Sequence, residues 1–117
     1  MVGVIIKSDD YQDLYVASSL VASLVLRGDD VDVFITGRAV SAFATGRASN
    51  VVEAMKSHGM DYMDILRQVK DIGKLRIRIC TGMMEVLGLS ESSLDPLIDG
   101  VSTFTDFVMN NDNIIVT

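Results

Sequence analysis

The chain has 117 residues, 49% of them hydrophobic, and carries 16 acidic against 10 basic side chains for a formal net charge of −6. This length predicts a single domain, residues 1–117, with a sizeable core, and the acidic balance argues against nucleic acid and anionic membrane surfaces as partners. One cysteine cannot form an internal disulfide, and with one histidine it cannot complete a tetrahedral zinc site, so no metal is expected.

No apolar run approaches the ~18–20 residues that a membrane span needs. The first residues lack the basic start and the cleavage site of a signal peptide, and Met1–Lys7 is apolar up to its first charge. We therefore expect a cytoplasmic protein whose chain begins with a strand.

The first third of the chain predicts a strand–helix–strand unit. Val2–Ile6 is a continuous apolar run, as in a parallel strand buried on both faces. Ser8-Asp9-Asp10 supplies N-cap candidates for a helix that begins near Tyr11 and stops at Gly28. Val31–Ile35 is the second strand, expected to be parallel to the first. The apolar stripe of the helix consists of Leu14, Ala17, Leu20, Val21, Leu24 and Val25.

The middle of the chain predicts two further helices. One starts just after Thr36-Gly37 and runs to about Thr45, and the segment 46–59, which has no clear period, is predicted to be partly helical. Asp61 then caps a helix that runs through Ile72. The inner side of this helix is expected to consist of Ile65, Leu66, Val69 and Ile72.

The segment Leu75–Cys80 predicts a strand with two unlike faces. Leu75, Ile77 and Ile79 share one face, and Arg76, Arg78 and Cys80 share the other. Central parallel strands are usually apolar on both faces. The arginine-bearing face therefore indicates a subunit interface, an anion or solvent.

The last third continues the alternation. Gly82-Met83 opens a short helix to Leu87, and a serine-capped turn that Pro96 prevents from extending follows it. Leu97–Val101 is predicted to be a strand, Ser102–Met109 a helix and Asn113–Val116 the final strand. Strands alternating with helices five times predict an α/β fold, a three-layer α/β/α sandwich with a mostly parallel sheet of about five strands.

Cys80 is the leading candidate for chemistry, because it ends a strand and immediately precedes a helix. Helix N-termini and nearby cations favour the thiolate form of a cysteine. The N–H groups of Thr81, Gly82 and Met83 are expected to stabilise a thiolate or persulfide there, with Arg78 as an electrostatic helper. Free cysteines also occur as small buried hydrophobic residues, so position alone leaves both interpretations open.

Two further residues are candidates for a pocket. Ligands of α/β sheets bind at the carboxyl ends of the strands. Gly37 follows the second strand there, and Asp9 follows the first, although N-capping explains Asp9 as well. Neither GxxxxGK[ST] nor GxGxxG occurs in the chain, and no cofactor is expected.

The region around Cys80 resembles the signature region of DsrE/DsrF-like sulfur-relay proteins, the DsrE/TusD type. The likeness is carried by Leu66-Arg-Gln-Val-Lys-Asp-Ile-Gly73, by the strand Leu75–Cys80 and by Cys80-Thr-Gly-Met-Met-Glu-Val-Leu-Gly88. The later segments Asp95–Val101, Ser102–Asp106 and Asn113–Val116 are also similar to that family, and the likeness is looser over Val2–Gly46.

The resemblance implies a sulfur-relay protein, and possible sulfurtransferase, in which Cys80 carries a persulfide or a bound thiosulfate. It implies exchange of this sulfur with TusA-like or rhodanese-like carrier proteins, and assembly as a homo-oligomer, a trimer or a multiple of it. No second cysteine is present to act as a resolving thiol. The alternative is a non-catalytic oligomeric DsrE-like adaptor that binds a partner protein. A third hypothesis, a nucleotide-binding regulator, is disfavoured by the missing phosphate-loop glycines.

Overall fold

The computed structural model describes residues 1–117 and contains five strands, six α-helices and one 3-10 turn. In chain order these elements are β1 (Val2–Ile6), α1 (Tyr11–Leu26), β2 (Val31–Ile35), α2 (Ala39–Thr45), α3 (Glu53–Ser57), α4 (Tyr62–Lys70), β3 (Leu75–Cys80), α5 (Thr81–Val86), η1 (Glu91–Ser93), β4 (Gly100–Ser102), α6 (Phe104–Met109) and β5 (Asn113–Val116).

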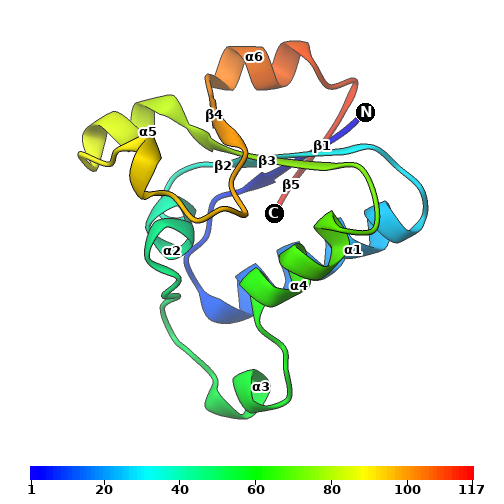
Figure 1. Cartoon of the computed structure of the whole chain (residues 1–117), viewed down its shortest axis with the longest axis vertical. Helices are drawn as coiled ribbons and strands as arrows, with labels where there is room; N and C mark the ends of the chain where they lie inside the picture. Colours follow the sequence, from blue (N-terminus) through cyan, green and yellow to red (C-terminus); the bar gives the residue numbers. More distant parts are fainter.

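The strands form one all-parallel sheet in the order β4-β3-β2-β1-β5. Figure 1 shows α1 and α4 on one side of the sheet and α6 on the other. This arrangement confirms the predicted α/β fold with a five-stranded sheet between helices. Parallel strands need crossover connections, and the helices between consecutive strands provide them.

The face toward α1, α2 and α4 contains the main core. Alternate strand residues point toward these helices, so Val4, Val33 and Ile77 are fully buried against them. The cluster comprises 24 buried residues, among them Leu14, Phe43, Tyr62 and Leu66 from the helices. At ~1.5–3 kcal/mol for each large apolar side chain removed from water, this face supplies most of the hydrophobic stabilisation.

The opposite face is covered by the short helix α6. Phe107 stacks on Phe34 with ring centroids 5.0 Å apart, and together with Ile5 they form a separate buried cluster of three residues. Gly3 permits this close packing, because a Cβ atom at Gly3 would lie 2.7 Å from Cζ of Phe107. Beside it, the amide nitrogen of Asn111 donates a hydrogen bond of 2.9 Å to the buried carboxylate of Asp32.

Asp99 covers the edge of β3 at Ile77, just before the pairing of β3 with β4 begins. The N–H of Asp99 donates to the carbonyl oxygen of Ile77 at 2.7 Å, and the N–H of Ile77 donates to the Asp99 carboxylate at 2.8 Å. Lys70 from α4 forms an ion pair with the same carboxylate at 2.6 Å. Both polar backbone groups of Ile77 on this edge are therefore satisfied without a neighbouring strand.

One helix ends earlier than the sequence predicts. Helix α4 stops at Lys70, and Ile72, predicted to lie on its inner side, is 66% exposed. The cause is the turn at Gly73, which packs so closely on α1 that a Cβ atom there would lie 2.6 Å from Cγ1 of Val25. The chain therefore leaves the helix before Ile72 can turn inward.

The strand predicted over Leu97–Val101 is wrong in its position. Strand β4 consists of Gly100–Ser102, while Leu97 and Ile98 are buried in a turn. The Asp95 carboxylate accepts a hydrogen bond from the N–H of Leu97 and so stabilises the turn. Helix α6 consequently begins at Phe104 and not at Ser102, with the side chain of Thr103 as its N-cap.

No helix combines the length and the apolar character that a membrane crossing requires.

Candidate functional site

Cys80 lies at the carboxyl end of β3, where it is also the N-cap residue of α5. Its side chain points to the α6 face of the sheet, and it packs against the cluster of Ile5, Phe34 and Phe107. The residue is neither fully buried nor fully exposed. The thiol therefore lies at the rim of an aromatic cluster, within reach of a reagent from solvent.

The backbone that follows Cys80 lies close to its sulfur but does not bind it. A Cβ atom at Gly82 would be 3.9 Å from Sγ, so a larger residue there would touch the thiol. The side chain of Cys80 makes no capping hydrogen bond to the amides of α5. That the N–H groups of Thr81, Gly82 and Met83 stabilise a persulfide stays a prediction.

Arg78 and Ser102 are polar neighbours of Cys80 in the sheet. Arg78 is half-buried on the same strand face, roughly 7 Å from Cys80 along the strand, and it takes part in none of the four ion pairs. Ser102 is the register partner of Cys80 on β4 and is 8% exposed. Sequence reasoning missed Ser102, because it predicted a helix start at this position and not a strand beside the thiol.

The two predicted pocket residues, Gly37 and Asp9, both lie in contacts between loops. Gly37 follows β2 with a positive φ of 55°, and its Cα packs on the backbone of Lys7. Asp9 instead joins the loop after α2, since Ser49 donates to it both from its hydroxyl at 3.1 Å and from its N–H at 2.8 Å. Asp9 therefore anchors the loop after α2 to the turn after β1.

Asp10 performs the N-capping that the sequence predicts for this segment. Its carboxylate accepts hydrogen bonds from the N–H groups of Gln12 and Asp13 at the start of α1. A hydrogen bond from the side chain of Asn50, followed by that from the N–H of Asp13, lowers the pKa of the Asp10 carboxyl below its ordinary value. Asp10 therefore links the turn after β1 to the start of α1 and to Asn50.

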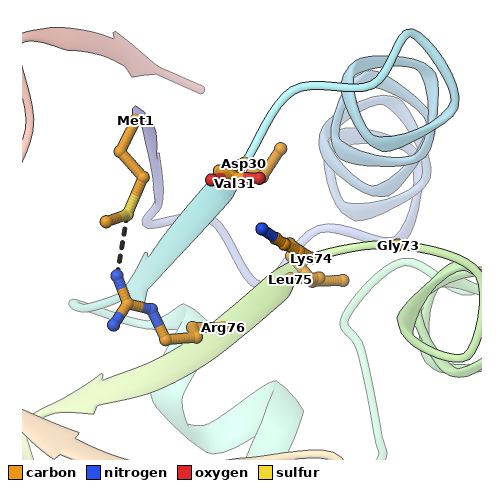
Figure 2. A pocket seen from close by; sticks show the side chains of 7 residues that line it. All are labelled: Met1, Asp30, Val31, Gly73, Lys74, Leu75 and Arg76. Carbon is orange, nitrogen blue, oxygen red and sulfur yellow. Dashed lines mark hydrogen bonds between the residues drawn. The ribbon is translucent and has the colours of Figure 1, made fainter.

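None of the five principal cavities is lined by Cys80. A cavity of about 450 Å³ opens at the amino ends of the strands, beside Asp30, Lys74 and Arg76 (Figure 2). Figure 2 shows the Arg76 guanidinium directed at the sulfur of Met1, at 2.8 Å. Arg76 precedes Cys80 by four strand residues, or roughly 13 Å, so this cavity does not serve the thiol. No cluster of histidine, cysteine and acidic residues is arranged to hold a metal.

Two solved structures share this fold over nearly the whole chain. The ychN protein from E. coli superposes with a TM-score of 0.67 at 17% identity, covering 99% of this chain and 97% of that one. MTH1491 from Methanobacterium thermoautotrophicum, described as a protein of unknown function, gives a TM-score of 0.70 at 16% identity with the same coverage. No family model matches the sequence, and no curated protein matches it. At this identity the likeness shows the α/β fold alone.

Proposed function

We propose that this protein is a cytoplasmic sulfur-relay protein in which Cys80 accepts a sulfur atom from a donor and transfers it to a partner. The observation that carries the proposal is the position of the only cysteine, half-buried at the carboxyl edge of a parallel sheet and at the start of a helix. Functional side chains of open α/β sheets gather at this edge. The resemblance of residues 66–88 to DsrE/DsrF-like proteins supports the same assignment.

The transfer step is a thiol exchange without net oxidation or reduction. The Cys80 thiolate attacks the outer sulfur of a donor persulfide, the donor S–S bond breaks, and the donor leaves as a thiolate. The acceptor thiolate then attacks the outer sulfur of the Cys80 persulfide, and Cys80 is released as a thiolate. With tetrathionate, the same attack gives an S-thiosulfonate on Cys80 and releases thiosulfate.

The surroundings of Cys80 favour a protein as donor or acceptor over a small molecule. The thiol lines none of the principal cavities, while α5 beside it exposes Val86 (78%) and Leu87 follows at 41%. An exposed apolar rim suits a docking surface for another protein. We assign the partner role to a TusA-like or rhodanese-like carrier whose own cysteine approaches Cys80 from this side.

The open part of the α6 face supports assembly into a homo-oligomer, a trimer or a multiple of it. Five of the exposed large apolar side chains lie on α6 and β5, namely Phe104, Val108, Met109, Ile114 and Val116. Ile114 and Val116 are register partners of Gly3 and Ile5, so they point to the same face as α6. Sedimentation velocity on Val116→Asp should show a smaller species, whereas Leu26→Asp, at an equally exposed site on α1, should sediment as the unchanged protein.

Intact mass measurement tests the relay function. The protein is incubated with a persulfide donor, thiosulfate or tetrathionate, and its mass is compared before and after reduction. We expect a reducible adduct of one sulfur atom, or of one thiosulfate unit with tetrathionate, that is absent from Cys80→Ser. The proposal is wrong if the protein acquires no adduct, or if Cys80→Ser acquires an equal one.

A non-catalytic adaptor is the second candidate, and one observation favours it. The sulfur of Cys80 receives no hydrogen bond from α5, so the fold lacks a visible device for holding a thiolate. An adaptor predicts that Cys80 reacts with iodoacetamide at the rate of a free thiol of ordinary reactivity. A relay protein predicts faster alkylation of Cys80 at neutral pH.

A further inference from the structure

Gly82 lies in the first turn of α5, at a position where the backbone does not require glycine. Helix α5 spans Thr81–Val86, and Gly82 is not among the glycines with a positive φ. Inside a helix, alanine is more favourable than glycine, because glycine loses more conformational freedom on folding. Backbone geometry therefore gives no reason for the missing side chain at Gly82.

The surroundings of Gly82 contain one atom that a side chain would meet. A Cβ atom at Gly82 would lie 3.9 Å from Sγ of Cys80, and no other atom outside the adjoining residues and the backbone of α5 lies within 4 Å. The contrast is with Gly3 and Gly73, where a Cβ atom would collide with Phe107 and Val25. Gly82 is also exposed to solvent. The missing side chain thus leaves an open space beside the sulfur and not a close packing contact.

Other sides of the Cys80 sulfur are occupied by the protein. The side chain packs against the cluster of Ile5, Phe34 and Phe107 on the α6 face. Ser102, its register partner, lies on the neighbouring strand, roughly 4.8 Å away, and is 8% exposed. Helix α5, in contrast, lies at the margin of the molecule in Figure 1. The space over Gly82 is therefore an open approach to the sulfur.

The distance from the sulfur matches what a sulfur exchange requires. The attacking sulfur, the sulfur that is transferred and the leaving sulfur must lie in one line. With S–S bonds of about 2.05 Å, the two outer sulfur atoms of this line are ~4 Å apart. A Cβ atom at Gly82, at 3.9 Å from Sγ, would take the place of the third sulfur along this approach.

We infer that Gly82 is a specificity-determining residue for sulfur transfer, because its missing side chain keeps open the line along which a partner's sulfur reaches Cys80. The inference rests on the proposed relay function. In loading, the Cys80 thiolate attacks the outer sulfur of a donor persulfide held over Gly82, the donor S–S bond breaks, and the donor leaves as a thiolate past α5. An acceptor thiolate reaches the outer sulfur of the Cys80 persulfide by the same route, and no net oxidation or reduction occurs.

Replacement of Gly82 by larger residues tests this role. Loading from tetrathionate, followed over time by intact mass, should be about tenfold or more slower in Gly82→Ala than in the wild type, and slower still in Gly82→Leu. The urea midpoint of Gly82→Ala should equal or exceed that of the wild type, since alanine favours the helix. Val86→Leu, which adds bulk at a site of α5 that is 78% exposed, should load at the wild-type rate. Unchanged loading of Gly82→Ala, or slower loading together with a lower urea midpoint, contradicts the inference.

Alkylation by iodoacetamide separates this inference from the relay function, because any reagent on the same approach is hindered by a methyl group at Gly82. If the wild type acquires no sulfur adduct but Gly82→Ala is alkylated several-fold more slowly, the relay function is wrong while Gly82 still controls access to the thiol. If the wild type is loaded and Gly82→Ala is loaded and alkylated at unchanged rates, the relay function stands and the role of Gly82 is wrong.

Discussion

The two faces of the sheet are covered to very different extents. On one face, four helices, the strands and the loop before β4 contribute to a continuous core of 24 buried residues, and on the other, the six-residue helix α6 covers a cluster of three. Cys80 lies on the sparsely covered face, and the other residues of β3 on that face are both arginines. One face therefore supplies most of the hydrophobic stabilisation, while the other leaves more of its side chains exposed to solvent.

The largest expected loss of stability comes from truncating a side chain in the main core. Ile77→Ala removes a fully buried side chain from β3, and we expect a loss of ~2–5 kcal/mol of unfolding free energy, since the surroundings cannot close the cavity. Arg76→Ala, one residue earlier on the opposite face, should change it by less than ~0.5 kcal/mol. Urea denaturation of both variants checks the comparison, which breaks down if the two losses are similar.

A smaller effect is expected where α6 packs on the sheet. Gly3→Ala places a methyl group 2.7 Å from Cζ of Phe107, so α6 must shift, at a cost of ~1–3 kcal/mol. Combining it with Phe107→Leu should recover part of this loss, because the shorter side chain makes room. A double-mutant cycle by urea denaturation measures the coupling, and strict additivity would show that the two residues do not collide.

Acid should lower the stability of the fold through Asp95, which lies in the loop before β4. Hydrogen bonding from the N–H of Leu97, followed by the contribution of Arg67, lowers the pKa of Asp95. A carboxyl with a lowered pKa stabilises the fold above the pKa of the unfolded chain, near 4, and this contribution is lost as the pH falls through the lower, folded value. The wild-type urea midpoint should therefore fall more steeply than that of Asp95→Asn below about pH 4. Parallel curves would rule out this role of Asp95.

The smallest effect is expected for Cys80→Ser. The thiol is half-buried and makes no hydrogen bond to α5, so its replacement should cost less than ~1 kcal/mol. Thermal unfolding of the variant measures this. A loss comparable to that of Ile77→Ala would mean that Cys80 belongs to the core and would weaken its assignment as a carrier.

Local sequence patterns were sufficient to predict the positions of the strands and the helix start that bury regular apolar repeats. Strands β1, β2 and β3 and the start of α1 lie where the patterns of Val2–Ile6, Val31–Ile35, Leu75–Cys80 and Asp10-Tyr11 predict them. The patterns failed where buried residues lie outside helices and strands. Leu97 and Ile98 are buried, but they lie in a turn. A short apolar run in the sequence does not reveal whether it forms a β-strand or a buried turn.

The polar features that depend on topology could not be read from the sequence. Asp32 is buried in the middle of an apolar strand because its partner Asn111 reaches it from 79 positions along the chain. The cations Lys7 and Arg38 likewise share a cavity with Ile115 only because β5 returns beside β1. Both arrangements depend on the order of the strands in the sheet, which local sequence periodicity does not encode.

The edge of β3 that faces away from β2 is covered in two ways. An unpaired strand edge is a template onto which further strands can add, and aggregation starts from such edges. Strand β4 pairs with Arg78, Ile79 and Cys80, and Asp99, the residue before β4, occupies both hydrogen-bonding groups of Ile77. The sheet therefore ends in β4 and β5, which have no strand on their outer sides, and lengthening by an added strand, in a complex or a fibril, is expected to start there and not from β3.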